Sequence, residues 1–139
     1  MKLQPDQMDT LAVTGYDADW IAVNGVRHKS SLMLSALGLL KPWDKSHFDQ
    51  LQDSDLAQLL ALKDQGIELI VVGTGAKLRF LPPAWLKTLQ TQHLGVECMD
   101  TPAACRTYNI LAGEGRRVAA ALLLQTSEAV KHSNSTDSL

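Results

Sequence analysis

Apolar and polar positions in the first third of the chain predict antiparallel β structure. In DWIAVNGVRHKSSLML, residues 19–34, two apolar runs flank Asn24-Gly25, the dipeptide that best tolerates the positive φ angles of a two-residue hairpin turn. Alternation of apolar and other side chains from 32 to 36 extends the β prediction. Because Pro42 lacks an N–H donor, we expect it to close this element, with a loop over KPWDKS around it.

After residue 52 the apolar period changes to that of a helix. Three helices are predicted, each from a residue that can accept the free N–H groups of a first turn, or from proline, to a glycine. The first helix is predicted from Asp53 or Ser54 to Gly66, and the second from Pro82-Pro83 to Gly95. The third is predicted from the N-cap Thr101, which Pro102 follows, to Gly113.

Short apolar segments lie between and after these helices. They are IELIVV at 67–72, VECM at 96–99 and VAAALLLQ at 118–125. Segments this short and this apolar are typical of strands that are covered on both faces. The alternation of helix and strand therefore predicts an α/β fold, with a β-hairpin added at the start of the sheet.

Length and composition indicate one ordinary globular domain. The 139 residues include 45% apolar and 20% charged side chains, with a formal net charge of -2. We place the domain at 8–125, between an N-terminal segment, 1–7, and a polar tail, 126–139, that we expect to be flexible. This charge gives no reason to expect a nucleic-acid partner.

The N-terminus and the apolar runs predict a cytoplasmic protein without membrane insertion. The stretch MKLQPDQMD lacks the apolar core of a signal peptide. The longest wholly apolar run, at 118–124, is far shorter than the ~20 residues that cross a bilayer. Cys98 and Cys105 lack the paired spacing and partner histidines of a zinc site, so we predict reduced thiols and no metal.

The loop in VVGTGAKLRFLPP, residues 71–83, is the clearest place for ligand chemistry. It lacks the third glycine of a dinucleotide-binding turn and the lysine with Ser or Thr of a P-loop, so no cofactor is predicted. Lys77 and Arg79 alternate with apolar residues, which would send both cations to one side, next to exposed loop N–H groups. The alternative is that the glycines only turn the chain and both cations are solvated, and this alternative is favoured.

The stretch ECMDTPAACRTYNILAGEGRRVAAA, residues 97–121, together with the upstream GTG and LPP, resembles a known family. It is a small α/β domain family of largely unknown biochemical function. Its eukaryotic relatives include a mitochondrial respiratory complex I assembly factor and an adipogenesis-associated protein. The resemblance covers roughly residues 8 to 125 and implies a three-layer single domain with a central mixed β-sheet and helices packed on it. It supplies no catalytic mechanism and no cofactor.

The third predicted helix carries two polar residues on one face, Arg106 and Asn109. Arg106 lies near the positive end of the helix, where a cation is disfavoured unless a carboxylate or a bound anion compensates it. A structural pair with Asp100 or another acid and a ligand role remain equally open. Trp43 has two interpretations as well, an interface anchor or a lid over the core, and the lid is favoured.

Two functions of different classes follow. The leading hypothesis is a non-enzymatic domain that acts on an unidentified protein partner, because no complete catalytic set is present and one branch of the family assembles a complex. The alternative is a small-molecule or anion-binding protein, or an enzyme, that uses a crevice between the GTG loop and the third helix. The candidate ligand-binding residues are Gly73, Thr74, Gly75, Lys77, Arg79, Thr101, Arg106 and Asn109.

Overall fold

The computed structural model describes residues 10–125, which form two β-sheets and three α-helices. The first sheet contains β1 (Val13–Asp17), β2 (Trp20–Val23) and β3 (Val26–His28). The second contains β4 (Ser31–Ser35), β5 (Leu40–Trp43), β6 (Leu69–Gly73), β7 (Gly95–Met99) and β8 (Val118–Leu122). The helices are α2 (Asp53–Ala61), α3 (Pro83–Thr91) and α4 (Thr101–Gly113), with short 3-10 turns η1 (Phe48–Gln50) and η2 (Leu62–Gln65). The predicted segment 1–7 and tail 126–139 lie outside the described residues.

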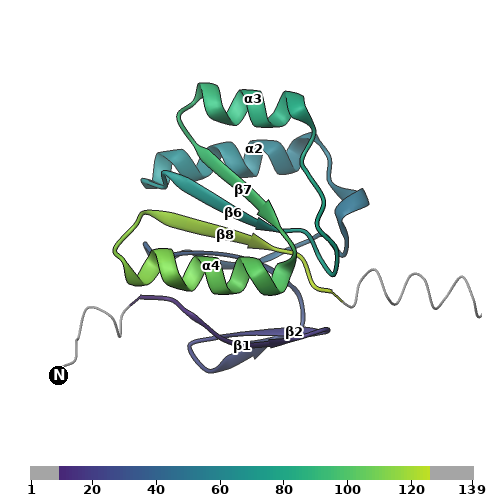
Figure 1. Ribbon diagram of the computed structural model, residues 1–139, viewed down its shortest axis with the longest axis vertical. Coiled ribbons are helices and arrows are strands. Elements are labelled where there is room, and N and C mark those ends of the chain that lie inside the picture. Colours follow the sequence, from purple (N-terminus) through teal and green to yellow (C-terminus); the bar gives the residue numbers. More distant parts are fainter. Residues whose placement is uncertain (1–9, 126–139) are drawn as a thin grey trace, which may run out of the picture.

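The central sheet is mixed, as predicted. Its strands lie in the order β5-β4-β8-β6-β7, with β8, β6 and β7 parallel and β4 and β5 antiparallel to their neighbours. Helices α2 and α3 cover one face, while α4 and the separate antiparallel sheet β1-β2-β3 cover the other (Figure 1). This arrangement confirms the α/β fold class and the N-terminal antiparallel hairpin.

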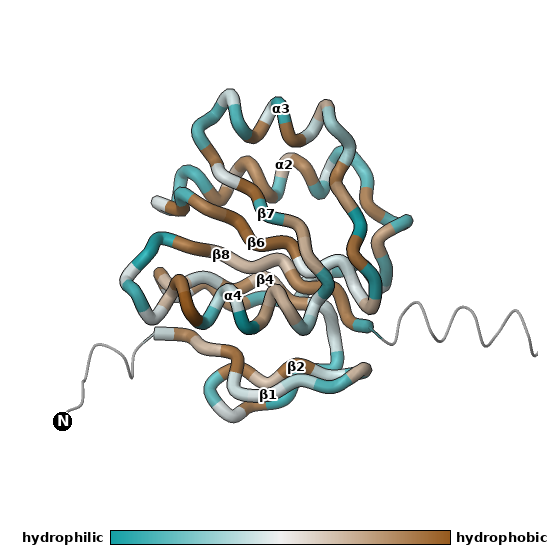
Figure 2. Tube along the Cα trace, viewed as in Figure 1, coloured by the Kyte–Doolittle hydropathy of each residue, from teal (hydrophilic) through white to brown (hydrophobic). Residues whose placement is uncertain are grey.

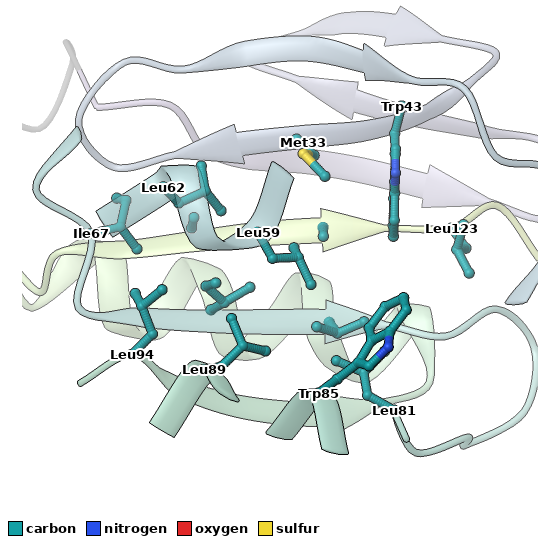
Figure 3. Packing of buried hydrophobic residues seen from close by; sticks show 14 residues of the cluster. Met33, Trp43, Leu59, Leu62, Ile67, Leu81, Trp85, Leu89, Leu94 and Leu123 are labelled. Atoms are coloured by element: carbon teal, nitrogen blue, oxygen red, sulfur yellow. The ribbon is translucent and has the colours of Figure 1, made fainter. Parts of the chain in front are cut away.

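Alternation along β6 divides the core between the two faces of the sheet. Ile70 and Val72 pack with α2 and α3, whereas Val71 packs with α4. All three are 0% exposed, as expected of a central strand covered on both faces. Brown apolar segments accordingly concentrate in the sheet and on the inner sides of the helices (Figure 2). On the first face, Leu59 of α2 and Trp85 of α3 point into the same cluster (Figure 3).

The predicted hairpin turn is confirmed in its backbone angles. Asn24 and Gly25 have φ values of 48° and 87°, the left-handed pair that joins β2 to β3. The prediction around Pro42 is wrong, because Pro42 lies inside β5, where it is opposite Leu32 of β4. β5 is an edge strand, and an edge strand tolerates proline because one side of its backbone has no partner strand.

Three predicted helix boundaries are also wrong by a few residues. α2 is capped at Gln52, whose N–H donates to the Asp55 carboxylate, and not at Asp53 or Ser54. α3 ends at Thr91, since His93 adopts a φ of 64° and turns the chain, and Gly95 already belongs to β7. The N-cap of α4 is Asp100, with Thr101 as the first helical residue. In each case a neighbouring side chain or turn provides the helix end that the sequence pattern assigned elsewhere.

Candidate functional site

The GTG loop and the start of α4 meet at the carboxyl ends of β6 and β7. β6 leads into α3 on one face of the sheet, and its neighbour β7 leads into α4 on the other. In open α/β sheets, the crevice between two such strands is where ligands usually bind. The predicted crevice therefore lies at this end of the sheet, and the local hydrogen bonds decide whether it is open to a ligand.

Hydrogen bonds join the two segments across this crevice. The N–H of Thr74 donates to the Met99 carbonyl at 2.9 Å. The N–H of Gly75 donates to Thr101 Oγ1, and the N–H of Thr101 donates to the Gly75 carbonyl, each at 2.9 Å. The N–H groups of Thr74 and Gly75, which we expected to be exposed, are thus bound to the protein itself.

Both threonines at this junction are buried and have protein partners. Thr74, 0% exposed, donates its hydroxyl hydrogen to the Lys77 carbonyl at 2.6 Å and accepts the N–H of Arg79 at 3.0 Å. Thr101, 1% exposed, donates to the Leu123 carbonyl at 2.6 Å. Their hydroxyls hold together the loop after β6, the start of α4 and the chain after β8.

Gly73 is the position where α4 comes close to the sheet. A Cβ at this residue would lie 2.9 Å from Thr101 Oγ1, 3.0 Å from Leu122 Cδ2 and 3.1 Å from Ala104 Cβ. These separations are too short for any side chain larger than hydrogen, so the glycine serves close packing. Gly75, by contrast, has a φ of 100° and turns the loop.

The N-terminus of α4 already carries a carboxylate. Asp100 Oδ1 accepts the N–H of Ala103 at 2.9 Å, and the Asp100 carbonyl accepts the N–H of Ala104 at 2.9 Å. Pro102 has no N–H, and the N–H of Thr101 donates to the Gly75 carbonyl. The donors that a helix start offers to an anion are therefore occupied, and the Asp100 carboxylate holds the favourable position.

The two cations of the loop differ in their surroundings. Arg79 donates to Asp49 at 2.9 Å, and its guanidinium lies 4.5 Å from the ring centroid of Phe48. Lys77 is exposed and makes no ion pair with the residues that the structure describes. Arg79 therefore fixes the loop against η1, and Lys77 alone remains available for an added anion.

Arg106 and Asn109 on α4 both contact β1. The exposed Arg106 guanidinium donates to the Tyr16 hydroxyl at 2.9 Å, so its partner is neither Asp100 nor another acid of the described chain. Asn109 accepts the N–H of Val13 at 2.9 Å and donates to the Val13 carbonyl at 2.7 Å. Asn109 thus pairs with β1 as the backbone of a neighbouring strand would. It also lines a shallow depression of about 260 Å³.

A pair of exposed apolar side chains follows the same loop and was not singled out from the sequence. Leu78 is 51% and Phe80 is 67% exposed. The next residue, Leu81, is buried in the core cluster against which Cys98 of β7 packs. The alternation of cations and apolar residues in this stretch fits a strand with a buried face equally well, so no local pattern indicates that the apolar pair faces solvent.

Trp43 belongs to the core, which confirms its interpretation as a lid. It is 3% exposed, and its Nε1 donates to Asp55 Oδ1 at 2.9 Å. Asp55 is itself 1% exposed and lies 3.5 Å from the ammonium of Lys45. This buried carboxylate was missed, because helical spacing alone places Asp55 beside the exposed acids of the first turn.

The buried thiol and phenol of α4 are kept in their neutral forms. Burial raises the pKa of the Cys105 thiol to about 12 and also raises the pKa of the Tyr108 hydroxyl, which donates to the Leu11 carbonyl at 2.8 Å. Burial raises the pKa of Cys98 as well. A raised thiol pKa disfavours the reactive thiolate. Among residues 10–125, no group of three or more His, Cys, Asp or Glu side chains could hold a metal ion.

No helix within residues 10–125 is long and apolar enough to cross a membrane. Together these features define a small α/β domain whose sheet crevice is closed by internal hydrogen bonds. The family described as "Protein of unknown function (DUF498/DUF598)" matches residues 13–123, and the chain belongs to it.

Relatives and solved structures agree with this assignment. An uncharacterized protein of Rhodobacter capsulatus is 36% identical over 120 residues, which cover 86% of this chain and 90% of that protein. Human NADH dehydrogenase (ubiquinone) 1 alpha subcomplex assembly factor 3 is 32% identical over 121 residues, which cover 87% of this chain but 65% of the human protein. The solution NMR structure of a Bordetella pertussis protein, a Mth938-like domain, matches with a TM-score of 0.76 and 32% identity, covering 90% of this chain and 93% of that one.

Proposed function

We propose that this protein is a non-enzymatic, cytoplasmic domain that binds a protein partner and acts in the manner of an assembly factor. The observation that carries the proposal is the exposed pair Leu78 and Phe80. Large apolar side chains that face solvent next to each other are typical of protein interaction sites. The similarity to a protein named as an assembly factor supports a role that depends on partner proteins.

The loop that presents this pair is held in place from within. The Thr74 hydroxyl binds both the Lys77 carbonyl and the Arg79 N–H, at 2.6 and 3.0 Å. The Arg79 side chain is fixed by Asp49. A loop that is already ordered loses little conformational entropy on binding, so more of the burial of Leu78 and Phe80 contributes to affinity.

The proposal is tested by purification of tagged protein from cells of its own source, followed by quantitative mass spectrometry. The double variant Leu78→Ser, Phe80→Ser should lose the co-purifying partner. The matched control is Val26→Ser, Ile110→Ser, since these side chains are 60% and 61% exposed and lie on β3 and α4. A partner that is retained by the first variant, or lost equally from both, would contradict the assignment of this surface.

Binding of a small anion at the same end of the sheet is the second candidate function. It rests on Lys77, which has no ion pair within residues 10–125, and on Arg106, whose partner is a neutral hydroxyl. The remaining candidate residues, Gly73, Thr74, Gly75, Arg79, Thr101 and Asn109, would then position the loop and the helix. A thermal-shift titration with inorganic phosphate should raise the melting temperature of the wild type and not of Arg106→Ala. An equal response of both proteins would rule out this site.

A further inference from the structure

The two sheets have four edge strands, and three of them carry a feature that discourages the addition of another strand. β5 has Lys41 and Pro42, and Pro42 offers no N–H. β3 is three residues long and carries Arg27. β1 has the N–H and carbonyl of Val13 covered by the Asn109 amide. Short strands, lysine or proline, and covered backbone groups are the usual means by which proteins protect their sheet edges.

β7 is the least protected of these edges, with Glu97 as its single charged residue. It is five residues long, Gly95–Met99, and contains no proline, lysine or arginine. Gly95 donates its N–H to Glu68, and the Met99 carbonyl accepts the N–H of Thr74, so alternate residues of β7 face β6. The residues between them, Val96 and Cys98, therefore direct their N–H and carbonyl groups away from the sheet. No hydrogen bond from described residues reaches these backbone groups.

A depression of about 380 Å³ lies beside this edge, between β7 and α3. Its lining residues are Leu86, Gln90, Leu94, Gly95, Val96 and Glu97. Val96 and Leu86 are half-buried at the margin of the core, on the α3 face of the sheet. Glu97 is exposed and points to the opposite face, because side chains alternate along a strand.

We propose that the open edge of β7 binds an extended segment of a partner protein as an added strand. Apolar side chains of that segment pack over Leu86 and Val96, and basic side chains lie beside Glu97. The proposal rests on the proposed function, since it gives the partner's mode of binding. Continuity with the exposed loop supports it, because Leu81, which follows that loop, lies in the core cluster against which Cys98 of the same strand packs. Backbone hydrogen bonds supply affinity in such strand addition, and alternate side chains supply specificity.

A second copy of this chain fits the edge less well. An antiparallel copy centred on Glu97 would place two carboxylates directly opposite each other, and like charges in that position are destabilising. A segment with lysine or arginine at that position gains an attractive pair instead. The charge of Glu97 thus selects a basic partner strand over self-association.

Amide hydrogen exchange of the free protein tests whether the edge is open. Val96 and Cys98 should exchange fast, while Glu97 and Met99, whose N–H groups face β6, should exchange slowly. Equally slow exchange at all four amides would show that the edge is already covered and would overturn the proposal.

Binding is tested with two short acetylated peptides, one alternating valine with lysine and one alternating valine with glutamate. The valine–lysine peptide should shift the NMR signals of Val96 and Cys98 and slow their exchange, and the valine–glutamate peptide should bind more weakly. Val96→Pro removes an N–H that β6 does not use, so it should weaken binding about fivefold, the effect of one lost hydrogen bond. Glu97→Lys should reverse the preference between the peptides, whereas Glu114→Lys on the turn after α4 should not.

Strand addition at β7 can be tested even if one of these variants does not fold. If Val96→Pro does not fold, the reversal by Glu97→Lys decides alone. Peptide binding that leaves Val96 and Cys98 unshifted, no binding at all, or a homodimer dissociated by Val96→Pro would overturn the proposal. A partner that co-purifies equally with wild type and Val96→Pro, but is lost with the Leu78 and Phe80 variant, would refute strand addition and leave the proposed function standing. If no protein co-purifies with the wild type, the proposed function fails. The peptide titration still tests whether the edge of β7 binds a basic strand.

Discussion

Asp55 shows how one buried carboxylate can connect three segments of the chain. Its oxygens accept the Trp43 Nε1–H at 2.9 Å and the Gln52 N–H at 3.0 Å, and the Lys45 ammonium lies 3.5 Å away. The first of these partners is at the end of β5, the second caps α2, and the third lies between them. A buried charge with several donors is stable as a set and unfavourable when one member is removed.

Asp55→Ala should therefore destabilise the protein by about 3 kcal/mol, because the buried Trp43 indole, the Gln52 N–H and the nearly buried Lys45 would lose their acceptor. Urea unfolding followed by tryptophan fluorescence measures the change. The exposed acid Asp64 in η2 provides the control, and Asp64→Ala should change stability by less than about 0.5 kcal/mol. Equal effects of both substitutions would show that the Asp55 contacts contribute nothing specific.

Thr101→Val tests the hydroxyl that joins the GTG loop to the chain after β8. Valine keeps the shape but leaves the Gly75 N–H and the Leu123 carbonyl without their partner, so we expect a loss of about 2 kcal/mol. Thr88→Val, at an exposed position on α3, should cost less than about 0.5 kcal/mol. If Thr101→Val is as stable as Thr88→Val, the crevice is not held closed by this hydroxyl.

α4 is the helix that connects the two sheets. It packs on β6 and β8 through Ala104 and Tyr108, with Gly73 leaving room for the close approach. On its other side, Asn109 holds the edge of β1. The same helix therefore positions the small sheet and supports the end of the central one.

Asn109→Ala should loosen β1 without unfolding the domain. The Val13 N–H loses its acceptor and becomes exposed to solvent, so its hydrogen exchange should accelerate, and global stability should fall by about 1 to 2 kcal/mol. Gln90→Ala removes an exposed amide on α3 and should change neither quantity. Unchanged exchange at Val13 would show that packing, and not this amide, holds β1.

Local signals made much of this fold predictable from the sequence. Asn24-Gly25 specifies its own turn, and the apolar segment containing β6 could only be a covered strand. β5 was missed because the tolerance of Pro42 depends on the strand's position at the edge, which no local pattern states. The candidate site was likewise predictable only where local or neighbouring-strand patterns determine it. The parallel-strand rule brought Thr74 and Thr101 together, but their partners, such as Leu123, come from distant parts of the chain.

The whole molecule combines a modest net charge with a core that contains a thiol and a phenol. The formal charge of -2 leaves no large repulsion between surface charges near neutral pH. Cys105 is 1% and Tyr108 is 0% exposed, and both lie in the core cluster between α4 and the sheets. Ionisation of these groups in the unfolded chain should therefore govern stability at alkaline pH.

Stability should fall as pH rises above 9, and Cys105→Ala should make this fall less steep. The thiol has an ordinary pKa of 9.0, which burial raises to about 12 in the folded state. Below pH 9 the thiol is protonated in both the folded and the unfolded state, so its contribution to the free energy of unfolding is fully present. Between the two values the unfolded state releases the proton and the folded state keeps it, so unfolding becomes easier by up to about 1.4 kcal/mol per pH unit. Burial also raises the pKa of Tyr108 above its usual 10.0, which adds to the decline. Urea unfolding at a series of pH values measures the slope, and an unchanged slope in Cys105→Ala would assign the alkaline loss to other groups.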